Sequence, residues 1–372
     1  MSLGFWLCML PCLGSSETPN LVDALSLPST EVTVAVEGQG YFPVVVAVGQ
    51  RIGVVLRGGG GHLGRGGRLD LVWSPDGGKT WTKPATIVDT PEDDRNPAVG
   101  VTAAGRLLLG FHHQGSYTPE GRYDPSLARA RCMTMYSDDG ITWSEPQPLS
   151  IDGLEPTSPY GRIVMFHDGT CLMNVYGPCA KTVPGMGSVP PNAGDYSYVV
   201  RSRDSGKTWS DPSLVAAGYN ETALIMPRGD LVAAARSAGD GHLAVFVSGD
   251  AGYTWERVAR VTDRSQHPAD MITLSNGWIL LVFGNRQEEK AIRGIVSRDG
   301  GRTWDTLQQI RFSAPSRGDF GYPSVVRHKG DLVLLHYWAG DAKDSYDGSK
   351  ARAYATRVRE SELLERLRVA AR

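Results

Sequence analysis

The sequence predicts an all-β fold, a six-bladed β-propeller with a short C-terminal helix. Three observations predict it: an S-x-D-x-G-x-T-W octapeptide recurs five times, each copy follows a run of strand composition, and helix-forming runs are almost absent before the C-terminus. Propellers repeat sheets of about four short strands around an axis. Five octapeptides, with further strands near both ends of the chain, favour six such sheets.

The octapeptides are predicted to be hairpin turns. They close at Trp81, Trp143, Trp209, Trp255 and Trp304. In a tight turn, Asp and Ser side chains accept hydrogen bonds from backbone amides, and Gly supplies a positive φ angle. The Thr-Trp pair then begins the outgoing strand. The aspartates of these octapeptides are therefore expected to form turns and not to act as paired catalytic acids.

Composition is that of a folded globular protein. The 372 residues are 41% hydrophobic and 21% charged, which leaves enough apolar side chains to fill cores between sheets. A net charge of −2 creates no general field for nucleic acid or anionic lipid, so neither is an expected partner. The five cysteines lack metal-ligand spacing with histidines, and no metal or organic cofactor is implied.

Three segments are expected along the chain. Residues 1–31 form a leader or tail, 32–359 the propeller, and 360–372 a capped amphipathic helix outside the ring. The apolar run 5–13 is similar to the hydrophobic part of a signal peptide, which would indicate a secreted or periplasmic protein. No Lys or Arg precedes that run, so a cytoplasmic location stays open.

The octapeptides resemble the Asp-boxes, or BNR repeats, of the sialidase superfamily. The resemblance extends from about Val32 to Arg359. It implies a six-bladed propeller whose boxes lie on outer turns, and an exo-acting glycoside hydrolase that releases a terminal, acidic sugar from a glycan substrate.

The stretch from Tyr219 to Arg236 is similar to a sialidase pattern that carries a glutamate and an arginine. The resemblance implies that Glu221 activates the nucleophile and that Arg236 is the second of three arginines around the substrate carboxylate. Glu221 opens a predicted strand and Arg236 ends its antiparallel return strand, so both side chains are expected at the same end of the sheet. The alternative is a buried ion pair that holds one blade together.

Tyr322, in the stretch from Gly318 to Val326, matches the nucleophilic tyrosine of sialidases. A tyrosine suits an anomeric carbon that bears a carboxylate, because an Asp or Glu nucleophile would be repelled. Its ordinary pKa near 10 requires a neighbouring base, for which Glu221 is the candidate. Asp319, at the start of the same strand, is a candidate substrate contact.

One position departs from the sialidase pattern. Tyr41, in Gly40-Tyr41-Phe42-Pro43, stands where the family has the first arginine of the clamp. Arg286, at the end of a predicted return strand, is the best match to the third arginine. The missing arginine should weaken recognition of an acidic sugar, because hydrogen bonds to charged groups contribute on the order of 1.5–3 kcal/mol each. A different terminal sugar therefore remains an alternative.

The glycine-rich loop 57–70 is expected to overhang the mouth of the propeller, where sialidases carry their acid/base residue. His62 and Asp70 are its candidate proton donors, and Arg57 is a candidate substrate contact. A structural loop anchor is the alternative for His62, and a strand residue paired with an arginine is the alternative for Asp70. The loop lacks a G-K-[ST] ending and precedes a strand, so a nucleotide site is not expected.

Other candidate substrate contacts lie where predicted inner strands begin. They are Arg95, His267 and Asp270. For Arg95 the alternative is a salt bridge with Asp94. The inserts 114–128 and 177–195 are predicted rim loops, since long loops in compact domains are commonly functional.

Two further functions remain open on the same fold. One is a polysaccharide lyase or another exo-glycosidase, with His62 and Tyr322 as base and acid. The other is a glycan-binding propeller without catalysis. The sequence does not predict the oligomeric state.

Overall fold

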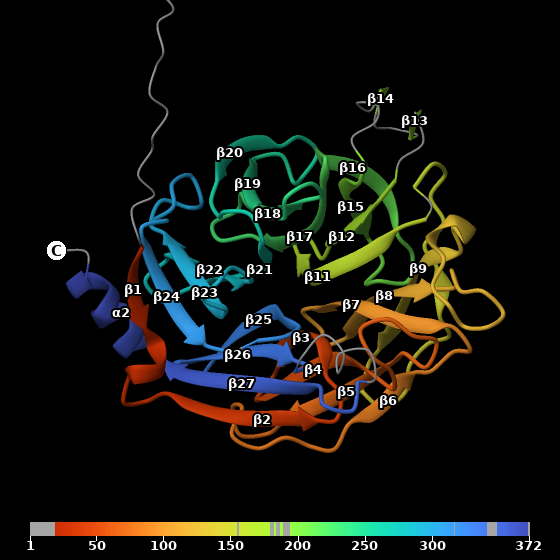
Figure 1. The fold of residues 1–372 in the computed structure, drawn as a ribbon. Coiled ribbons are helices and arrows are strands. Elements are labelled where there is room, and N and C mark those ends of the chain that lie inside the picture. The colour runs from red at the N-terminus through yellow and green to blue at the C-terminus, as the bar shows by residue number, and fades with distance from the viewer. Residues whose placement is uncertain are drawn as a thin grey trace, which may run out of the picture.

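Strands arranged in a propeller-like ring make up the fold, and one short helix lies outside the ring (Figure 1). The computed structural model describes residues 19–154, 156–178, 182–183, 187–188, 194–315, 317–340 and 348–370. The apolar run 5–13 and most of the insert 177–195 lie outside the described residues. The predicted all-β class with one short C-terminal helix is confirmed.

Three antiparallel sheets of four strands stand alone in the described part of the chain. The first contains β3 (Tyr41–Val48), β4 (Arg51–Gly58), β5 (Arg68–Ser74) and β6 (Ala85–Val88). The second contains β17 (Tyr219–Ile225), β18 (Leu231–Ser237), β19 (Leu243–Ser248) and β20 (Glu256–Arg260). The third contains β25 (Phe320–His328), β26 (Asp331–Trp338), β27 (Arg352–Arg359) and β2 (Glu31–Glu37).

Another sheet has five strands because an early strand joins its edge. It contains β21 (Gln266–Thr273), β22 (Ile279–Asn285), β23 (Ala291–Ser297), β24 (Gln308–Ser313) and β1 (Asn20–Asp23). Strand β1 pairs in parallel with β24, and the short helix η1 (Ala24–Ser26) follows it. Regular structure therefore begins before residue 32, where the propeller was expected to start.

The remaining large sheet has eight strands and differs from the separate four-stranded sheets that the sequence predicts. It contains β7 (Asp93–Val101), β8 (Leu107–Gln114), β9 (Ala130–Ser137), β10 (Gln147–Pro148), β11 (Ser158–Met165), β12 (Cys171–Gly177), β15 (Tyr196–Ser202) and β16 (Ser210–Ala217). Its halves join where β7 and β11 pair in parallel. Gly100 permits this approach, because a Cβ there would lie 2.6 Å from Cβ of Ile163. The short helix η2 (Pro125–Leu127) and the strand pair β13 (Thr182–Val183) and β14 (Gly187–Ser188) lie outside the large sheets.

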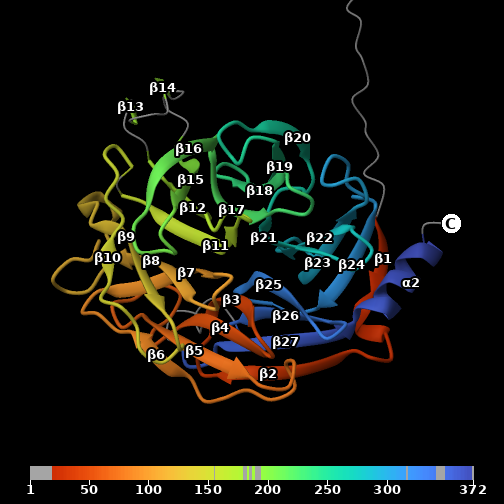
Figure 2. The same cartoon turned by 180° about the vertical axis from the view of Figure 1, so that it is seen from behind.

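The inner strands close a ring around the axis. Strand β3 contacts β7, followed in turn by β11, β17, β21 and β25, and β25 contacts β3 again. Strand β2, from near the N-terminus, pairs with β27 from near the C-terminus, as the red and blue strands side by side in Figures 1 and 2 show. The chain thus closes the ring with one strand from each end.

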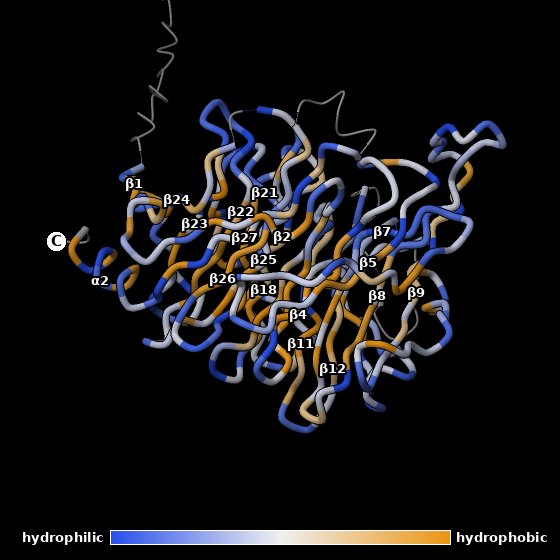
Figure 3. The backbone as a smooth tube through the Cα atoms, turned by 90° about the horizontal axis from the view of Figure 1, so that it is seen from below, coloured by the Kyte–Doolittle hydropathy of each residue, from blue (hydrophilic) through white to orange (hydrophobic). Residues whose placement is uncertain are grey.

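The hydrophobic core lies between neighbouring sheets. Val45 and Val54 of one sheet, for example, are buried in a cluster with Val333 and Leu335 of the next. In Figure 3 the apolar segments follow the strands, whereas polar segments follow the loops at both ends of the ring. Burial of such side chains contributes roughly 25 cal/mol per Å² of apolar surface, which makes the interfaces between sheets the main stabilising element.

Helix α2 (Glu360–Ala370) packs against the outside of the five-stranded sheet. Leu363, Leu364 and Leu367 are buried in the same cluster as Leu274. Glu360 also accepts a hydrogen bond from the backbone amide of Ser275. Among the residues described, no helix has the length and apolar character needed to cross a bilayer.

Each octapeptide connects the third strand of a four-stranded unit to the fourth. In the first copy the amide of Gly78 donates to Ser74 Oγ at 2.7 Å, and the amide of Thr80 donates to Asp76 Oδ1 at 2.9 Å. Thr80 Oγ1 donates to the other carboxylate oxygen of Asp76 at 2.6 Å. Burial alone would raise the pKa of Asp76, but these hydrogen bonds lower it to about 2. The aspartate is thus fully occupied as a turn former.

The second octapeptide uses different residues from those its alignment implies. Ser137 and Asp139 make the turn hydrogen bonds, one position later than Tyr136 and Asp138 in the pattern. Successive strands alternate in direction, so the turn after a third strand lies at the opposite end of the sheet from the start of the first strand. The octapeptides are therefore at the end of the ring away from the first residues of the inner strands.

Candidate active site

Irregular pairing at the start of the inner strands creates the candidate site. The pairing between first and second strands shifts register between Tyr41 and Val44, Arg95 and Ala98, Tyr219 and Thr222, Gln266 and Ala269, and Gly321 and Ser324. Such bulges turn a side chain away from its regular alternation and are common beside active sites. Phe42, Asn96 and Tyr322 lie in three of these bulges and line one small cavity on the axis.

Those three residues share an unusual backbone conformation. Their φ angles are 54°, 47° and 50°, in the left-handed region that residues other than glycine seldom adopt. A proline follows each of them, at positions 43, 97 and 323. The bulge and the following proline together set the direction in which each side chain leaves its strand.

Tyr322 and Glu221 are in direct contact. The Tyr322 hydroxyl donates a hydrogen bond to Glu221 Oε1, and Arg236 Nη1 donates to Glu221 Oε2 at 2.6 Å. Glu221 is buried, whereas 30% of the Arg236 side chain is exposed. Tyr322, Glu221 and Arg236 come from β25, β17 and β18. The sequence predicts that they lie together, and they do in the structure.

The environment of Tyr322 keeps its hydroxyl protonated. Burial and the neighbouring Glu221 carboxylate raise its pKa well above the ordinary value of 10, and the Arg236 cation offsets only part of this effect. The hydroxyl can act as a nucleophile only if a base takes its proton during attack. Glu221 Oε1, to which the hydroxyl already donates, is in position to take it.

Arg286 lies beside His267 at the end of β22. Its Nη1 donates to the backbone carbonyl of His267 and is 3.3 Å from His267 Nδ1. Burial, with the cations of Arg286 and Arg236 nearby, lowers the pKa of His267 to about 2. His267 is therefore neutral at ordinary pH. Gly321 leaves room for Arg286, since a Cβ there would lie 2.5 Å from Arg286 Nη2.

His62 pairs with Asp319 at the same end of the ring. Its Nδ1 is 2.7 Å from Asp319 Oδ2, and the Tyr337 hydroxyl donates to Asp319 Oδ1 at 2.7 Å. The ring of Phe42 connects His62 with Tyr322, because its centroid is 5.0 Å from the first ring and 4.6 Å from the second. Phe42 is thus in contact with both His62 and Tyr322.

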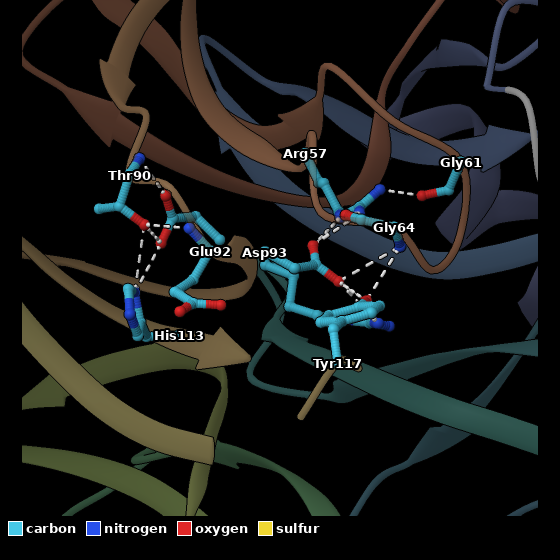
Figure 4. A network of polar contacts seen from close by, with 10 residues as sticks. Arg57, Gly61, Gly64, Thr90, Glu92, Asp93, His113 and Tyr117 are labelled. Atoms are coloured by element: carbon cyan, nitrogen blue, oxygen red, sulfur yellow. Dashed lines mark hydrogen bonds and ion pairs between the residues drawn. The ribbon is translucent and has the colours of Figure 1, made fainter. Parts of the chain in front are cut away.

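Arg57 is hydrogen-bonded to the glycine-rich loop (Figure 4). It is fully buried, and it donates to the carbonyls of Gly61 and Gly64 and, at 2.6 Å, to Asp93 Oδ1. Tyr117, from the insert 114–128, donates to Asp93 Oδ2 at 2.5 Å. No part of the Arg57 side chain is exposed to a ligand, and its hydrogen bonds make it a support for the loop.

Two carboxylates from the sequence prediction have protein partners on both oxygens. Asp70 is fully buried and accepts from Gln39 at 2.8 Å, from Arg68 at 3.0 Å and from Thr86 at 2.7 Å. Asp270 is buried too. It accepts from the amides of Met271 and Val325 at 2.8 Å each, and from Arg162 at 2.8 Å. These contacts are structural and leave neither carboxylate open to a substrate.

Arg95 lies near the site but is mostly covered. Only 10% of its side chain is exposed, and its guanidinium carbon is 5.4 Å from the centroid of the Phe42 ring. Its charge partner is Asp93, at 3.6 Å, and not Asp94. Asp94 instead accepts from Thr90 and is 3.1 Å from His113 Nδ1. The alternative given for Arg95, a salt bridge with Asp94, is therefore wrong, because the partner is Asp93.

Sequence reasoning missed Phe42, Asn96 and Tyr337. Phe42 and Asn96 line the axial cavity with Tyr322, and Asn96 donates to Ser158 and Tyr176 of the neighbouring strands. A usable signal was present, because an X-Pro pair begins several inner strands at equivalent positions, as in Phe42-Pro43, Asn96-Pro97, His267-Pro268 and Tyr322-Pro323. Tyr337 had no such signal. Within the described ranges, no group of three or more His, Cys, Asp or Glu residues could hold a metal ion.

A model of the BNR repeat-like domain matches residues 69–335 of this chain. The chain belongs to that family. Its predicted membership of the sialidase superfamily is confirmed.

Two curated relatives of this BNR-repeat protein are sialidases. It is 28% identical over 206 residues to a sialidase of Clostridium perfringens, a match that covers 49% of this chain and 50% of that protein. It is 25% identical over 321 residues to a sialidase of Bacteroides fragilis (strain YCH46), covering 76% of this chain and 56% of the relative. The chain therefore spans about half the length of each.

Solved structures agree on the fold of this BNR-repeat protein. The Trypanosoma rangeli sialidase superposes with a TM-score of 0.64 at 16% identity, covering 90% of this chain and 57% of that one. At this identity the similarity concerns the arrangement of strands alone.

Proposed function

We propose that this protein is an exo-acting glycoside hydrolase of sialidase type, which releases a terminal acidic sugar from a glycan. One observation carries the proposal: the Tyr322 hydroxyl donates to the Glu221 carboxylate, and Arg236 binds the other oxygen of that carboxylate at 2.6 Å. The sialidases of Clostridium perfringens and Bacteroides fragilis among its relatives support the same reaction class.

Tyr322 would be the nucleophile and Glu221 its general base. The hydroxyl oxygen attacks the anomeric carbon while its proton passes to Glu221, so a free phenolate is never required despite the raised pKa of Tyr322. A neutral nucleophile is not repelled by a carboxylate on the sugar, which is why sialidases depart from the usual pair of acidic residues.

Arg236 and Arg286 would bind the sugar carboxylate. Each is partly exposed at the mouth, and a planar guanidinium suits a carboxylate. Tyr41, at the place expected for another arginine, is fully buried. The proposed clamp therefore has two arginines, and Arg95 is mostly covered. Neutral His267 beside Arg286 adds no further charge.

His62 is a better candidate for the proton donor than Asp70. About a third of its side chain is exposed, whereas Asp70 is fully buried with partners on both oxygens.

We also interpret the ring as six blades. The eight-stranded sheet divides at the short β7–β11 pairing into two units of four strands, each with an octapeptide between its third and fourth strands.

The test is turnover of arylglycosides of sialic acid and other terminal acidic sugars by the wild-type chain and by Tyr322→Phe. Loss of the nucleophile should lower kcat by at least about 1000-fold, and Glu221→Gln should do nearly the same. Tyr253→Phe is the matched control, because its hydroxyl bonds Asp211 on an outer turn, and its activity should equal wild type.

Other outcomes would decide against the proposal. Ultraviolet absorbance of an unsaturated uronate would indicate a lyase, and glycan binding without turnover would indicate a lectin. Unchanged turnover in both Tyr322→Phe and Glu221→Gln would exclude the mechanism.

A further inference from the structure

His62, Asp319 and Tyr337 form a chain of hydrogen bonds from the core to the mouth of the ring. Tyr337 is fully buried and donates to one oxygen of Asp319, and the other oxygen pairs with His62 Nδ1 at 2.7 Å. About a third of the His62 side chain is exposed. Because Nδ1 faces Asp319, Nε2 is the nitrogen that can face a bound sugar.

The backbone on either side of His62 is held independently of this chain of hydrogen bonds. The buried Arg57 donates to the carbonyls of Gly61 and Gly64, and the amide of Gly64 donates to the Tyr117 hydroxyl at 3.0 Å. Both the loop and the imidazole ring are therefore fixed before any substrate binds, which is what a proton donor requires.

The groups that face His62 are one carboxylate and two aromatic rings. Asp319 is its direct partner at 2.7 Å, and the imidazole ring makes edge-to-face contacts with the rings of Phe42 and Tyr41. The charge of Arg57 is paired with Asp93, and the Arg286 cation helps to lower the pKa of Asp319. Burial alone would raise the pKa of Asp319, but the bonds to His62 and Tyr337 lower it, so its carboxylate stays charged.

The departure at position 41 fits this arrangement. Tyr41 is buried, with its ring centroid 6.0 Å from that of His62. An arginine there would place a second cation beside the imidazolium and disfavour it. A neutral side chain at position 41 and a histidine at position 62 are therefore compatible, whereas an arginine and a histidine would oppose each other.

We propose that Asp319, held by Tyr337, is a positioning residue that presents His62 Nε2 to the leaving-group oxygen, so that the proton donor is an imidazolium and not a carboxylic acid. The proposal rests on the proposed hydrolase function. It reassigns Asp319, which the sequence suggested as a substrate contact.

Protons and bonds balance over the two halves of the reaction. The Tyr322 oxygen bonds to the anomeric carbon as its proton moves to Glu221. The glycosidic bond breaks, and the leaving oxygen takes the proton from His62 Nε2. Neutral His62 then takes a proton from water, whose oxygen bonds to the anomeric carbon. The bond to Tyr322 breaks, and its oxygen recovers the proton from Glu221.

The test compares two leaving groups in the Asp319→Asn variant. The substrates are the 4-nitrophenyl and methyl glycosides of the acidic sugar that wild type cleaves fastest, with sialic acid tried first. A methoxide leaving group needs the proton, so kcat on the methyl glycoside should fall by about 100-fold. The 4-nitrophenolate needs little help, so kcat on that substrate should fall by less than about 5-fold.

The pH profile gives a second readout. Without the Asp319 carboxylate the imidazolium loses its negative partner, so the basic limb of kcat should move to lower pH. Asp331→Asn is the matched control. It makes the same change at the start of β26, at the opposite end of the β25–β26 pair from Asp319. Asp331 there pairs with Arg357 at 2.7 Å, and the variant should change neither the profile nor the dependence on leaving group.

Two further variants keep the proposal testable if Asp319→Asn does not fold. Tyr337→Phe should show the same dependence on leaving group with a smaller loss, about 3- to 10-fold on the methyl glycoside. His62→Ala should lose the methyl glycoside activity and regain part of it when free imidazole is added. Equal losses on both substrates, with Tyr322→Phe inactive, would overturn the role of Asp319 and leave the hydrolase standing. An active Tyr322→Phe would instead overturn the hydrolase.

Discussion

The outer turns and the mouth of the ring use the same kinds of side chain in opposite ways. In the turn after β19, Asp250 bonds only residues of its own octapeptide, among them the amide of Thr254 at 2.9 Å and the hydroxyl of Ser248 at 2.8 Å. At the mouth, Glu221 bonds Tyr322 and Arg236, which lie 101 and 15 residues away. One carboxylate serves its own turn, and the other joins three strands.

The difference shows why repeats are informative about fold and silent about chemistry. A turn repeats because its hydrogen bonds are local, so any chain segment with the right residues forms it. The mouth does not repeat, because five inner strands each contribute a different side chain at a bulge near their start. Phe42, Asn96, Glu221, His267 and Tyr322 occupy those positions. The mouth is thus asymmetric although the scaffold is nearly symmetric.

Among the variants that compare the mouth with the outer turns, Arg236→Gln should have the largest effect. Loss of a charge-assisted hydrogen bond to the substrate carboxylate, on the order of 1.5–3 kcal/mol, should lower kcat/KM on an acidic sugar by about 10- to 150-fold. Arg203→Gln is the control, because Arg203 pairs with Asp211 on the outer side and 56% of its side chain is exposed. It should leave kcat/KM unchanged. Equal effects of the two variants on kcat/KM would show that Arg236 does not bind the substrate carboxylate.

Asp250→Asn should affect stability and leave catalysis intact. Hydrogen bonds from the amide and side chain of Thr254 lower the pKa of Asp250 to about 2, and the variant weakens both. The free energy of unfolding should fall by about 1–2 kcal/mol in urea titrations, with kcat unchanged. A loss of kcat in the folded variant would contradict the separation of turns from mouth.

His267→Gln should change the pH dependence of stability. The pKa of His267 is lowered to about 2 in the folded chain, whereas an unfolded histidine has a value near 6.5. Between these values the unfolded chain binds the extra proton, so this contribution is present above about pH 6.5 and is lost as the pH falls. Below pH 6 the free energy of unfolding should therefore fall less steeply with decreasing pH in the variant than in wild type. The difference in slope should be on the order of 1 kcal/mol per pH unit. An unchanged slope between pH 6 and 4 would show that His267 is accessible to protons in the folded state.

Much of the candidate site was predictable because its signals are local in sequence. Glu221 and Arg236 belong to one hairpin, so strand direction alone placed them together. Phe42 and Asn96 carried an X-Pro signal that was not used. The alternative given for Asp70, a strand residue paired with an arginine, is what the structure shows, since Arg68 donates to it at 3.0 Å. The roles of Arg57 and Asp319 could not be predicted, because their partners, Asp93 and His62, come from other strands or loops. Only packing decides which charged side chain turns inward.

The sequence by itself determined the repeating turns, the all-β class and the side chains available for chemistry. Hydrogen bonds within eight residues and the alternation of apolar side chains do not depend on distant contacts. Tertiary structure alone decided that β7 pairs with β11, that Tyr41 is buried where an arginine was expected, and that Asp319 faces His62 across 257 residues. These features arise when the ring closes, since closure brings the starts of separate strands within hydrogen-bonding distance.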